Sequence, residues 1–141
     1  MKSMFKKIMI PVDLRHTPSM GKALNIAAEL AKSNNATVTY VGVTSPEPGE
    51  LGHNPAEYSE KLKQFAAAQA DAHGHSAQTH MIVANDPAID LDSQLTQAAE
   101  ETGADLVVMA THIPNVTDYV WSSHGGYLAN HARASVFLVR G

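Results

Sequence analysis

The residues of this chain best suited to chemistry are an aspartate near its start and a polar segment near its end. Asp13 closes the stretch PVD, and the segment 109–126 reads MATHIPNVTDYVWSSHGG. The segment follows an apolar run and holds a Pro-Asn turn, two serines and two glycines, a pattern typical of a strand, a loop and a helix start. α/β proteins hold phosphate with this arrangement. The residues therefore indicate a phosphorylated ligand, with Asp13 accepting from a ribose hydroxyl or an adenine amino group.

Each of these residues also has a purely structural interpretation. An aspartate just after a strand caps a helix or forms a turn about as often as it binds a ligand, and Pro11 alone marks only the end of a strand. Two serines before a helix are more often N-caps. For Tyr119 and Trp121 we favour packing in the core over closing the crevice.

Other kinds of site find little support in the sequence. The chain has eight histidines and no cysteine, and the histidine spacing matches no zinc signature, so we predict no metal site. His112 differs from the others because it falls in the predicted loop, where it polarises a phosphate or bonds its own loop. Neither a G-x-S-x-G elbow nor a G-x-x-x-x-G-K-[ST] loop is present, and we assign no catalytic residue.

Length and composition favour one globular domain over residues 1–141. Apolar residues make up 44% of the chain and charged residues 17%, and the net charge is −4. A basic patch is missing, so we expect no binding to nucleic acid. The apolar run near the start is only about five residues long, too short for a signal peptide. No run approaches the roughly 20 apolar residues that span a bilayer. We therefore expect a cytoplasmic protein that does not contact a membrane.

Hydrophobic spacing along the chain predicts strands that alternate with helices. Thr17 is the expected N-cap of the first helix, with Pro18 in its first turn, and a short helical turn is left open between 113 and 121. The expected strands are 5–12, 36–44, 76–84, 105–110 and 135–140, and the expected helices are 17–35, 55–74, 86–103 and 122–132.

This order predicts an α/β fold: a single-domain, doubly wound, flavodoxin- or Rossmann-like sheet of five parallel strands with helices on both faces. Ligands of such sheets sit beyond the carboxyl ends of the strands, where the winding reverses. If the first and fourth strands are neighbours, Asp13 meets the loop after the fourth strand. Pro11 and Val43 then supply apolar walls for a base, and the backbone N–H groups of 122–124 face a phosphate.

Three stretches of the chain resemble the universal stress protein family. They are KKIMIPVDL near the start, GADLVVMATH before the loop, and SS…NHARASVFLVR at the end. The resemblance covers nearly the whole chain and implies a flavodoxin-like fold, a dimer, and ATP binding through a G-x2-G-x9-G-[S/T] motif. It implies a stress-response regulatory protein that binds ATP or AMP, with Mg²⁺ held through the phosphates and at most slow hydrolysis.

The chain departs from that motif. Ala110 stands at the first glycine, Ile113-Pro114 at the second and Ser122 at the third, while Ser123 keeps the final hydroxyl. The loop is one residue shorter and is most similar to the F/G-type subgroup, whose loop reads A-S-H-x-P and whose members can bind nucleotide without the full glycine set. Because Pro114 lacks an N–H and stiffens the loop, we expect weaker binding than with a full motif.

Carried over position by position, the resemblance assigns the following site. Pro11, Val12, Asp13 and Val43 lie on the base and ribose side, and Ala110, Thr111, His112, Ser122, Ser123 and His124 lie on the phosphate side. The alternative is a partner-binding dimer with a vestigial pocket. A small hydrolase using Ser123 and His112 is a third reading. The family pairs its last strand across a two-fold axis, which predicts a homodimer through Ser135, Val136, Phe137, Leu138 and Val139.

Overall fold

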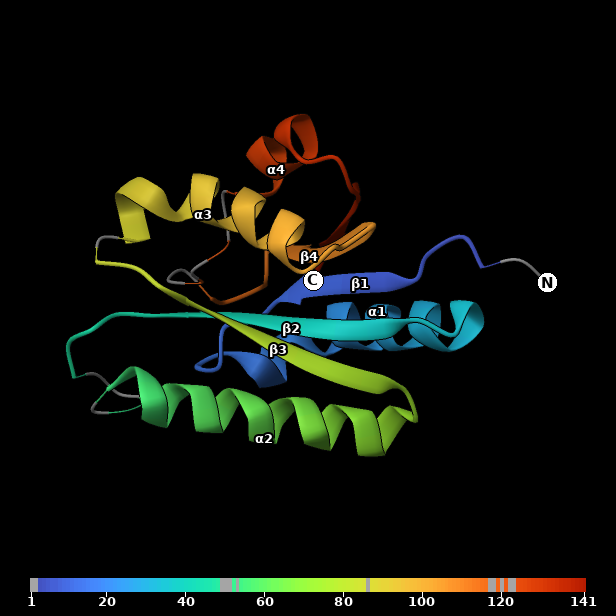
Figure 1. The fold of residues 1–141 in the computed structure, drawn as a ribbon, viewed down its shortest axis with the longest axis horizontal. Coiled ribbons are helices and arrows are strands. Elements are labelled where there is room, and N and C mark those ends of the chain that lie inside the picture. The colour runs from blue at the N-terminus through green and yellow to red at the C-terminus, as the bar shows by residue number, and fades with distance from the viewer. Residues whose placement is uncertain are drawn as a thin grey trace.

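The computed structural model describes residues 3–48, 52, 54–85, 87–116, 119, 121 and 124–141, without the side chains of 87–90. Strands and helices alternate along the chain, as the hydrophobic spacing predicts (Figure 1). The elements are β1 (Lys7–Pro11), a 3₁₀ turn (Thr17–Met20), α1 (Gly21–Asn34), β2 (Thr37–Thr44), α2 (Pro55–His73), β3 (Ser76–Val83), α3 (Pro87–Glu101), β4 (Leu106–Thr111), α4 (Gly125–His131) and β5 (Ser135–Arg140).

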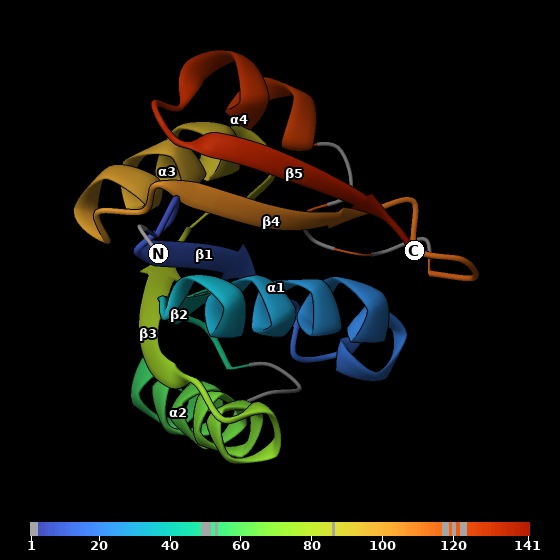
Figure 2. The same ribbon diagram turned by 90° about the vertical axis from the view of Figure 1, so that its right-hand side faces the viewer.

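The sheet is parallel throughout and has the strand order β3-β2-β1-β4-β5. Helices α1 and α2 cover one face, and α3 and α4 cover the other (Figure 2). The predicted five-stranded, doubly wound fold is therefore confirmed. The chain winds outward from β1 through β2 to β3 and then returns to add β4 on the other side of β1. The reversal of winding thus lies between β1 and β4, the neighbours that the predicted crevice requires.

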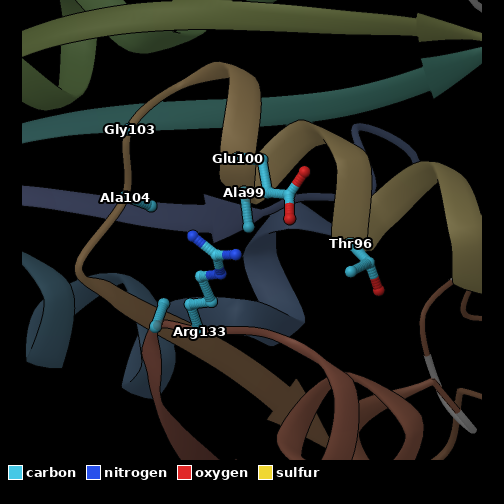
Figure 3. Close-up of a pocket in the computed structure, with 7 residues that line it drawn as sticks. Thr96, Ala99, Glu100, Gly103, Ala104 and Arg133 are labelled. Carbon is cyan, nitrogen blue, oxygen red and sulfur yellow. The ribbon is translucent and has the colours of Figure 1, made fainter.

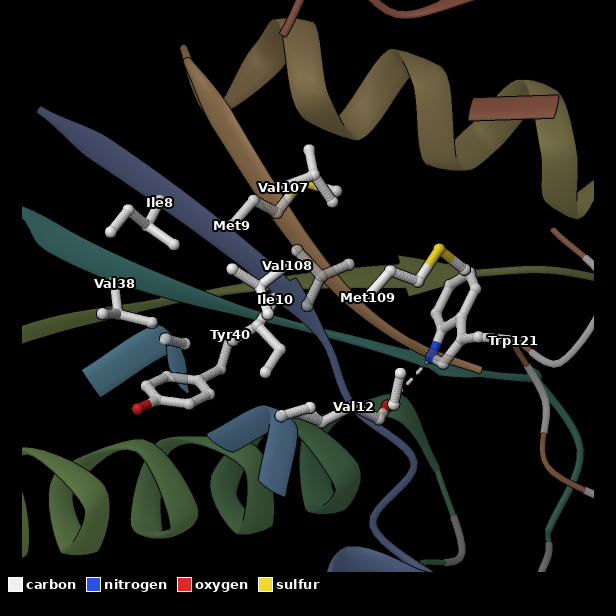
Figure 4. Packing of buried hydrophobic residues seen from close by; sticks show 14 of the residues in the cluster. Ile8, Met9, Ile10, Val12, Val38, Tyr40, Val107, Val108, Met109 and Trp121 are labelled. Atoms are coloured by element: carbon white, nitrogen blue, oxygen red, sulfur yellow. Dashed lines mark hydrogen bonds between the residues drawn. The ribbon is translucent and has the colours of Figure 1, made fainter. Parts of the chain in front are cut away.

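The central strands are apolar at consecutive positions because helices cover both of their faces. Ile8, Met9 and Ile10 of β1 have no exposed surface, and neither do Val107 and Val108 of β4. Figure 4 shows these side chains leaving the two strands on opposite sides of the sheet. This core fixes β1 and β4 side by side, with Ile8 opposite Leu106 and Met9 opposite Val107.

Helix boundaries agree with the sequence for α2 and differ for α1. Asn54 caps α2 by accepting a 2.9 Å hydrogen bond from the backbone N–H of Glu57, and Gly74 ends it with φ +76°. The prediction that Thr17 caps the first helix is wrong. Thr17 begins a 3₁₀ turn, and α1 starts only at Gly21 with no side-chain cap. Hydrogen bonds at the start of that turn, from the His16 N–H to the Asp13 carbonyl and from the Ser19 N–H to the His16 carbonyl, satisfy the backbone locally.

The last helix packs closely on the edge strand β5. A Cβ added at Gly125 would lie 2.6 Å from Leu138 Cδ2, so a larger residue there requires the leucine side chain to shift, whereas Gly126 has open space. In the described part of the segment 113–121, Pro114 and Asn115 form a turn rather than the short helix left open by the sequence. Among the residues that the structure describes, no helix has the length and apolar character needed to cross a bilayer.

Candidate functional site

The carboxyl ends of β1, β2 and β4 bring most of the predicted site residues to one edge of the sheet, which we call the carboxyl edge. Pro11 ends β1 and is buried, and Asp13 follows it two residues later. Val43 lies near the end of β2 and is half-buried. Ala110 and Thr111 end β4 and are buried. The base side and the phosphate side of the predicted site therefore start from neighbouring strands.

Asp13 is a buried charged residue at the carboxyl edge, and only 4% of its surface is exposed. Its carboxylate accepts three hydrogen bonds from Arg15. The backbone N–H and Nε bind Oδ1, each at 3.1 Å, and Nη2 binds Oδ2 at 3.0 Å. The hydrogen bond from the Arg15 backbone N–H closes a turn, as predicted above for an aspartate that follows a strand without binding a ligand. The ion pair supplies the positive charge that a buried carboxylate needs, so Asp13 has its charge held at the end of β1.

Two buried tyrosines lie within electrostatic reach of Asp13. Burial raises the pKa of Tyr58 and Tyr119, and the negative charge of Asp13 raises each further, while a hydrogen bond with the Val43 backbone and the charge of Arg15 partly offset this for Tyr58. Tyr119 is 3% exposed, and its hydroxyl has no hydrogen-bond partner among the described residues. A buried hydroxyl without a partner carries a desolvation penalty of about 1–3 kcal/mol, so the Tyr119 hydroxyl is an unsatisfied polar group near Asp13.

The same burial predicts how stability depends on alkaline pH. The pKa values of Tyr40, Tyr58 and Tyr119 all lie above the ordinary value of 10 in the folded chain. Their contribution is complete well below pH 10 and is lost progressively as the pH rises toward and past 10, because only the unfolded chain then releases protons. We expect the free energy of unfolding to fall by about 1 kcal/mol between pH 8 and pH 10 from these groups. Urea unfolding across this range measures it, and Tyr119→Phe should show about a third less dependence.

Trp121 ties the loop after β4 to the end of β1. Its side chain is fully buried, and its Nε1–H donates a 3.1 Å hydrogen bond to the Val12 carbonyl, the dashed line in Figure 4. The prediction that Trp121 and Tyr119 pack in the core is confirmed. The Val12 N–H donates to the Val41 carbonyl at 2.8 Å. Because both backbone groups of Val12 are engaged and its side chain is buried, we interpret Val12 as support for the site.

In the described part of the loop that leaves β4, the left-handed turns fall at positions other than Ala110 and Ile113-Pro114. Ala110 lies inside the strand, and the positive φ angles fall at His112 (49°) and Asn115 (64°). Asparagine and histidine tolerate this conformation better than most residues. The absence of glycine at Ala110 and Ile113 therefore costs nothing in backbone conformation. The Thr111 hydroxyl points at the Val139 carbonyl oxygen, 3.4 Å away, and the His112 side chain is exposed.

The predicted phosphate side is described only in part. Ser122 and Ser123 lie outside the described residues, so their role stays a prediction. His124 precedes α4, and its Nδ1 pairs with Oδ1 of Asp92 on α3. This bond fixes the orientation of the imidazole, whose ring also meets the Trp121 ring edge to face at 6.4 Å. These two contacts of His124 connect α3, the start of α4 and Trp121.

Two cavities lined by described residues lie at the opposite edge of the sheet. One, of about 410 Å³, lies where β4 and β5 begin, and Glu100 and Arg133 both project toward it (Figure 3). The other, of about 600 Å³, lies where β2 and β3 begin and includes Lys32 and His75 in its lining. Neither contains a predicted site residue. The described residues also hold no group of three side chains placed to bind a metal ion.

The contribution of Arg15, Tyr58 and Tyr119 to the carboxyl edge was not predicted from the sequence. The available signal was the position of Arg15 two residues after a strand-ending aspartate, where an Asx turn brings its side chain back. For the tyrosines no local signal existed, because their proximity to Asp13 depends on the tertiary fold.

The chain matches a known protein family and is similar in structure to several solved proteins. The model of the universal stress protein family matches residues 4–140. A family protein from Burkholderia pseudomallei is similar in structure, with a TM-score of 0.68 at 25% identity over 99% of this chain and 98% of that one. The Archaeoglobus fulgidus universal stress protein in complex with dAMP has a TM-score of 0.63 at 18% identity, covering 96% and 98%. An Arabidopsis thaliana family protein with AMP bound has a TM-score of 0.62 at 14% identity, covering 96% and 91%.

Proposed function

The chain belongs to the universal stress protein family, and we propose that it binds an adenine nucleotide, ATP or AMP, at the carboxyl edge of its sheet. Two of the structurally similar proteins described above were solved with dAMP or AMP bound. The observation that carries the proposal is the charged, buried carboxylate of Asp13 at the point where the winding of the sheet reverses. Doubly wound sheets bind their ligands at this point.

The chemistry of the carboxyl edge suits the sugar of a nucleotide. An ionised carboxylate accepts hydrogen bonds from two hydroxyl groups and cannot donate, so Asp13 matches the ribose hydroxyls. Pro11 and the half-buried Val43 offer apolar surface to an adenine ring next to it. In this proposal the phosphates extend toward Thr111, His112 and the start of α4, with Mg²⁺ held through their oxygens.

The proposed role is binding rather than turnover. In this proposal, nucleotide binding changes the affinity of the protein for its partners in a cytoplasmic stress response. His124 is engaged by Asp92 and Arg15 by Asp13, so these two residues are held by carboxylates rather than poised beside a water or a γ-phosphate. We therefore propose that ATP hydrolysis, where it occurs, is slow.

Isothermal titration calorimetry with AMP and with ATP plus Mg²⁺ tests the proposal. We expect one saturable site per chain with a dissociation constant in the micromolar to millimolar range. The matched control is GMP, whose base presents an oxygen where adenine has its amino group. Heats that remain at the dilution level up to several millimolar AMP would remove adenine-nucleotide binding as the function.

A second candidate function rests on the exposed edge of β5. Phe137 and Leu138 are 44% and 43% exposed, and β5 pairs with β4 on one side only. An exposed apolar edge strand offers unpaired backbone groups with which the strand of another chain can pair. We propose that two copies pair through Ser135–Arg140 and that this surface operates whether or not the pocket holds a ligand.

Replacing Phe137 with aspartate is expected to shift the chain from dimer to monomer. Two-fold symmetry places the substitution in the interface twice, and each copy loses about 1.5–3 kcal/mol of apolar burial and adds an unpaired charge. Light scattering after size exclusion at micromolar concentration measures the mass. Val83→Asp is the matched control, because Val83 is 42% exposed on the other edge strand, β3. A wild-type monomer, or equal effects of the two substitutions, would contradict the interface.

A further inference from the structure

We propose that Asp92 and His124 form a proton-linked contact with the phosphate of the bound nucleotide. Asp92 is a positioning residue that holds the imidazole through Nδ1, and His124 is the residue that touches the ligand through Nε2. The contact gives the affinity for AMP a dependence on pH that the affinity for adenosine lacks. The inference rests on the proposed nucleotide binding, and it assigns Asp92 a role that the family resemblance does not.

The pair joins α3 to the residue before α4. Nδ1 of His124 pairs with Oδ1 of Asp92, and the two side chains are 17% and 40% exposed. An ionised carboxylate only accepts hydrogen bonds, so the proton between the two groups belongs to Nδ1, and Nε2 of the neutral ring carries a lone pair. Within the described part of the chain, Nε2 makes no hydrogen bond. One nitrogen therefore orients the ring, and the other is left for a further partner.

Trp121 connects this pair to the sugar side of the proposed site. Its indole meets the imidazole edge to face, with ring centroids 6.4 Å apart, and its N–H donates to the Val12 carbonyl at 3.1 Å. Val12 directly precedes Asp13, the proposed partner of the ribose. A single buried indole thus contacts both His124 and the residue before Asp13. In this proposal a nucleotide whose sugar is held at Asp13 extends its phosphate toward His124.

The groups around the imidazole make a proton necessary for this contact. Among the described residues, Asp92 is the titratable group paired with the ring from α3, and the indole that packs on it carries no charge. On α4 itself, His131 stacks on Tyr127 and donates to its backbone carbonyl instead. A phosphate that approaches the neutral imidazole meets the lone pair of Nε2 and the negative charge of Asp92 behind it. A proton on Nε2 removes both obstacles, because the imidazolium donates to the phosphate and offsets the carboxylate.

This proton has to come from the solvent at alkaline pH. Histidine side chains ordinarily titrate near about pH 6.5 and phosphate monoesters near about pH 6, so at pH 8 both partners arrive without the shared proton. Binding of AMP at pH 8 therefore takes up about one proton, and the affinity for AMP falls as the pH rises from 6 to 8, by at most about tenfold per unit. Adenosine has no phosphate and takes up no proton at His124.

Calorimetry with AMP and with adenosine at pH 6, 7 and 8 tests the inference on the unmodified chain, in two buffers that differ in enthalpy of ionisation. We expect the AMP affinity to be about tenfold higher at pH 6 than at pH 8, with a buffer-dependent heat that corresponds to about one proton at pH 8. The adenosine affinity should change by less than about twofold. AMP that binds at pH 8 without proton uptake would overturn the inference, whereas a chain that binds neither ligand at any pH would remove the proposed function itself and the inference with it.

Three variants identify the residues that carry the effect. His124→Gln loses the titrating nitrogen, so we expect its AMP affinity to be the same at pH 6 and pH 8 and close to the wild-type value at pH 8. Asp92→Asn keeps an oxygen that accepts from Nδ1 but loses the charge, so the ratio between pH 6 and pH 8 should fall to about threefold. His131→Gln is the matched control, because His131 is an exposed histidine of α4 outside the proposed site, and it should keep the wild-type profile. A pH dependence that survives in His124→Gln or disappears in His131→Gln would overturn the assignment, and an unchanged profile in Asp92→Asn would overturn the positioning role.

Discussion

Replacing Trp121 with alanine is expected to lower the free energy of unfolding by about 3–5 kcal/mol, the usual cost of deleting a fully buried tryptophan. The side chain has no exposed surface, and its indole N–H satisfies the Val12 carbonyl at 3.1 Å. The substitution leaves a cavity and an unpaired carbonyl at the same place. Urea unfolding followed by circular dichroism measures the effect, since the variant lacks the only tryptophan that fluorescence would report.

Two further variants separate the contributions to this loss. Trp121→Phe keeps most of the apolar contact and removes the N–H, so we expect it to cost about 1–3 kcal/mol. Tyr127→Ala deletes an aromatic ring that is 38% exposed on α4 and should cost less than about 1 kcal/mol. Equal losses for Trp121→Ala and Tyr127→Ala would show that the loop after β4 is not anchored by the indole.

Asp13→Asn is expected to weaken AMP binding by about 10- to 150-fold, the range that corresponds to one hydrogen bond to a charged group. The amide keeps the size of the carboxylate, but one of its two terminal groups becomes a donor and meets ribose hydroxyls with the wrong polarity. Arg15 also loses the negative charge of Asp13, but its side chain is 29% exposed and can turn toward water. Calorimetry at one fixed ionic strength measures the change in affinity, and thermal unfolding confirms that the variant is folded.

Asp105→Asn is the matched control for this substitution. The Asp105 carboxylate lies at the opposite edge of the sheet, where it accepts the backbone N–H groups of Lys6 and Lys7 at 2.8 and 3.1 Å. We expect Asp105→Asn to lower stability and to leave the AMP affinity within about twofold of the wild type, since it removes a carboxylate far from the ligand. AMP affinities that fall equally in both variants would place the effect in global stability rather than in the site.

Local pattern was sufficient to predict most of the elements but not how they are arranged. The length of α2 was predicted from the spacing of its apolar residues, and its end from Gly74. Both signals depend only on residues that are close along the chain. The pairing of β1 with β4 has no such local signature, since a strand buried on both faces is apolar whichever strands flank it. That pairing was only a condition of the predicted crevice, and the observed strand order establishes it. The prediction that Thr17 caps the first helix was wrong because the backbone hydrogen bonds that follow Asp13 form a 3₁₀ turn instead.

In the candidate site, too, only the residues with a local signal in the sequence were predicted. The position of Asp13 after β1 was predicted, because a polar residue directly after an apolar strand is visible in the sequence. Its bond to Arg15 follows from the turn geometry, and Tyr119 reaches it only through the fold of a loop that begins almost one hundred residues later. The missing glycines suggested a costly loop, yet the left-handed positions in its described part are His112 and Asn115. The family motif predicts left-handed backbone at the glycine positions, whereas the dihedral angles of this chain place it at His112 and Asn115.

The central place of β1 has a consequence for biosynthesis. The ribosome makes this strand early, but its partner β4 follows only about 100 residues later, as the pairing of Ile8 with Leu106 shows. At about 5–20 residues per second the nascent strand waits roughly 5–20 s with one apolar side uncovered. Loop closure over such a distance also slows the final pairing. The nascent chain is thus most exposed to aggregation, and most in need of a chaperone, before the second half of its sheet exists.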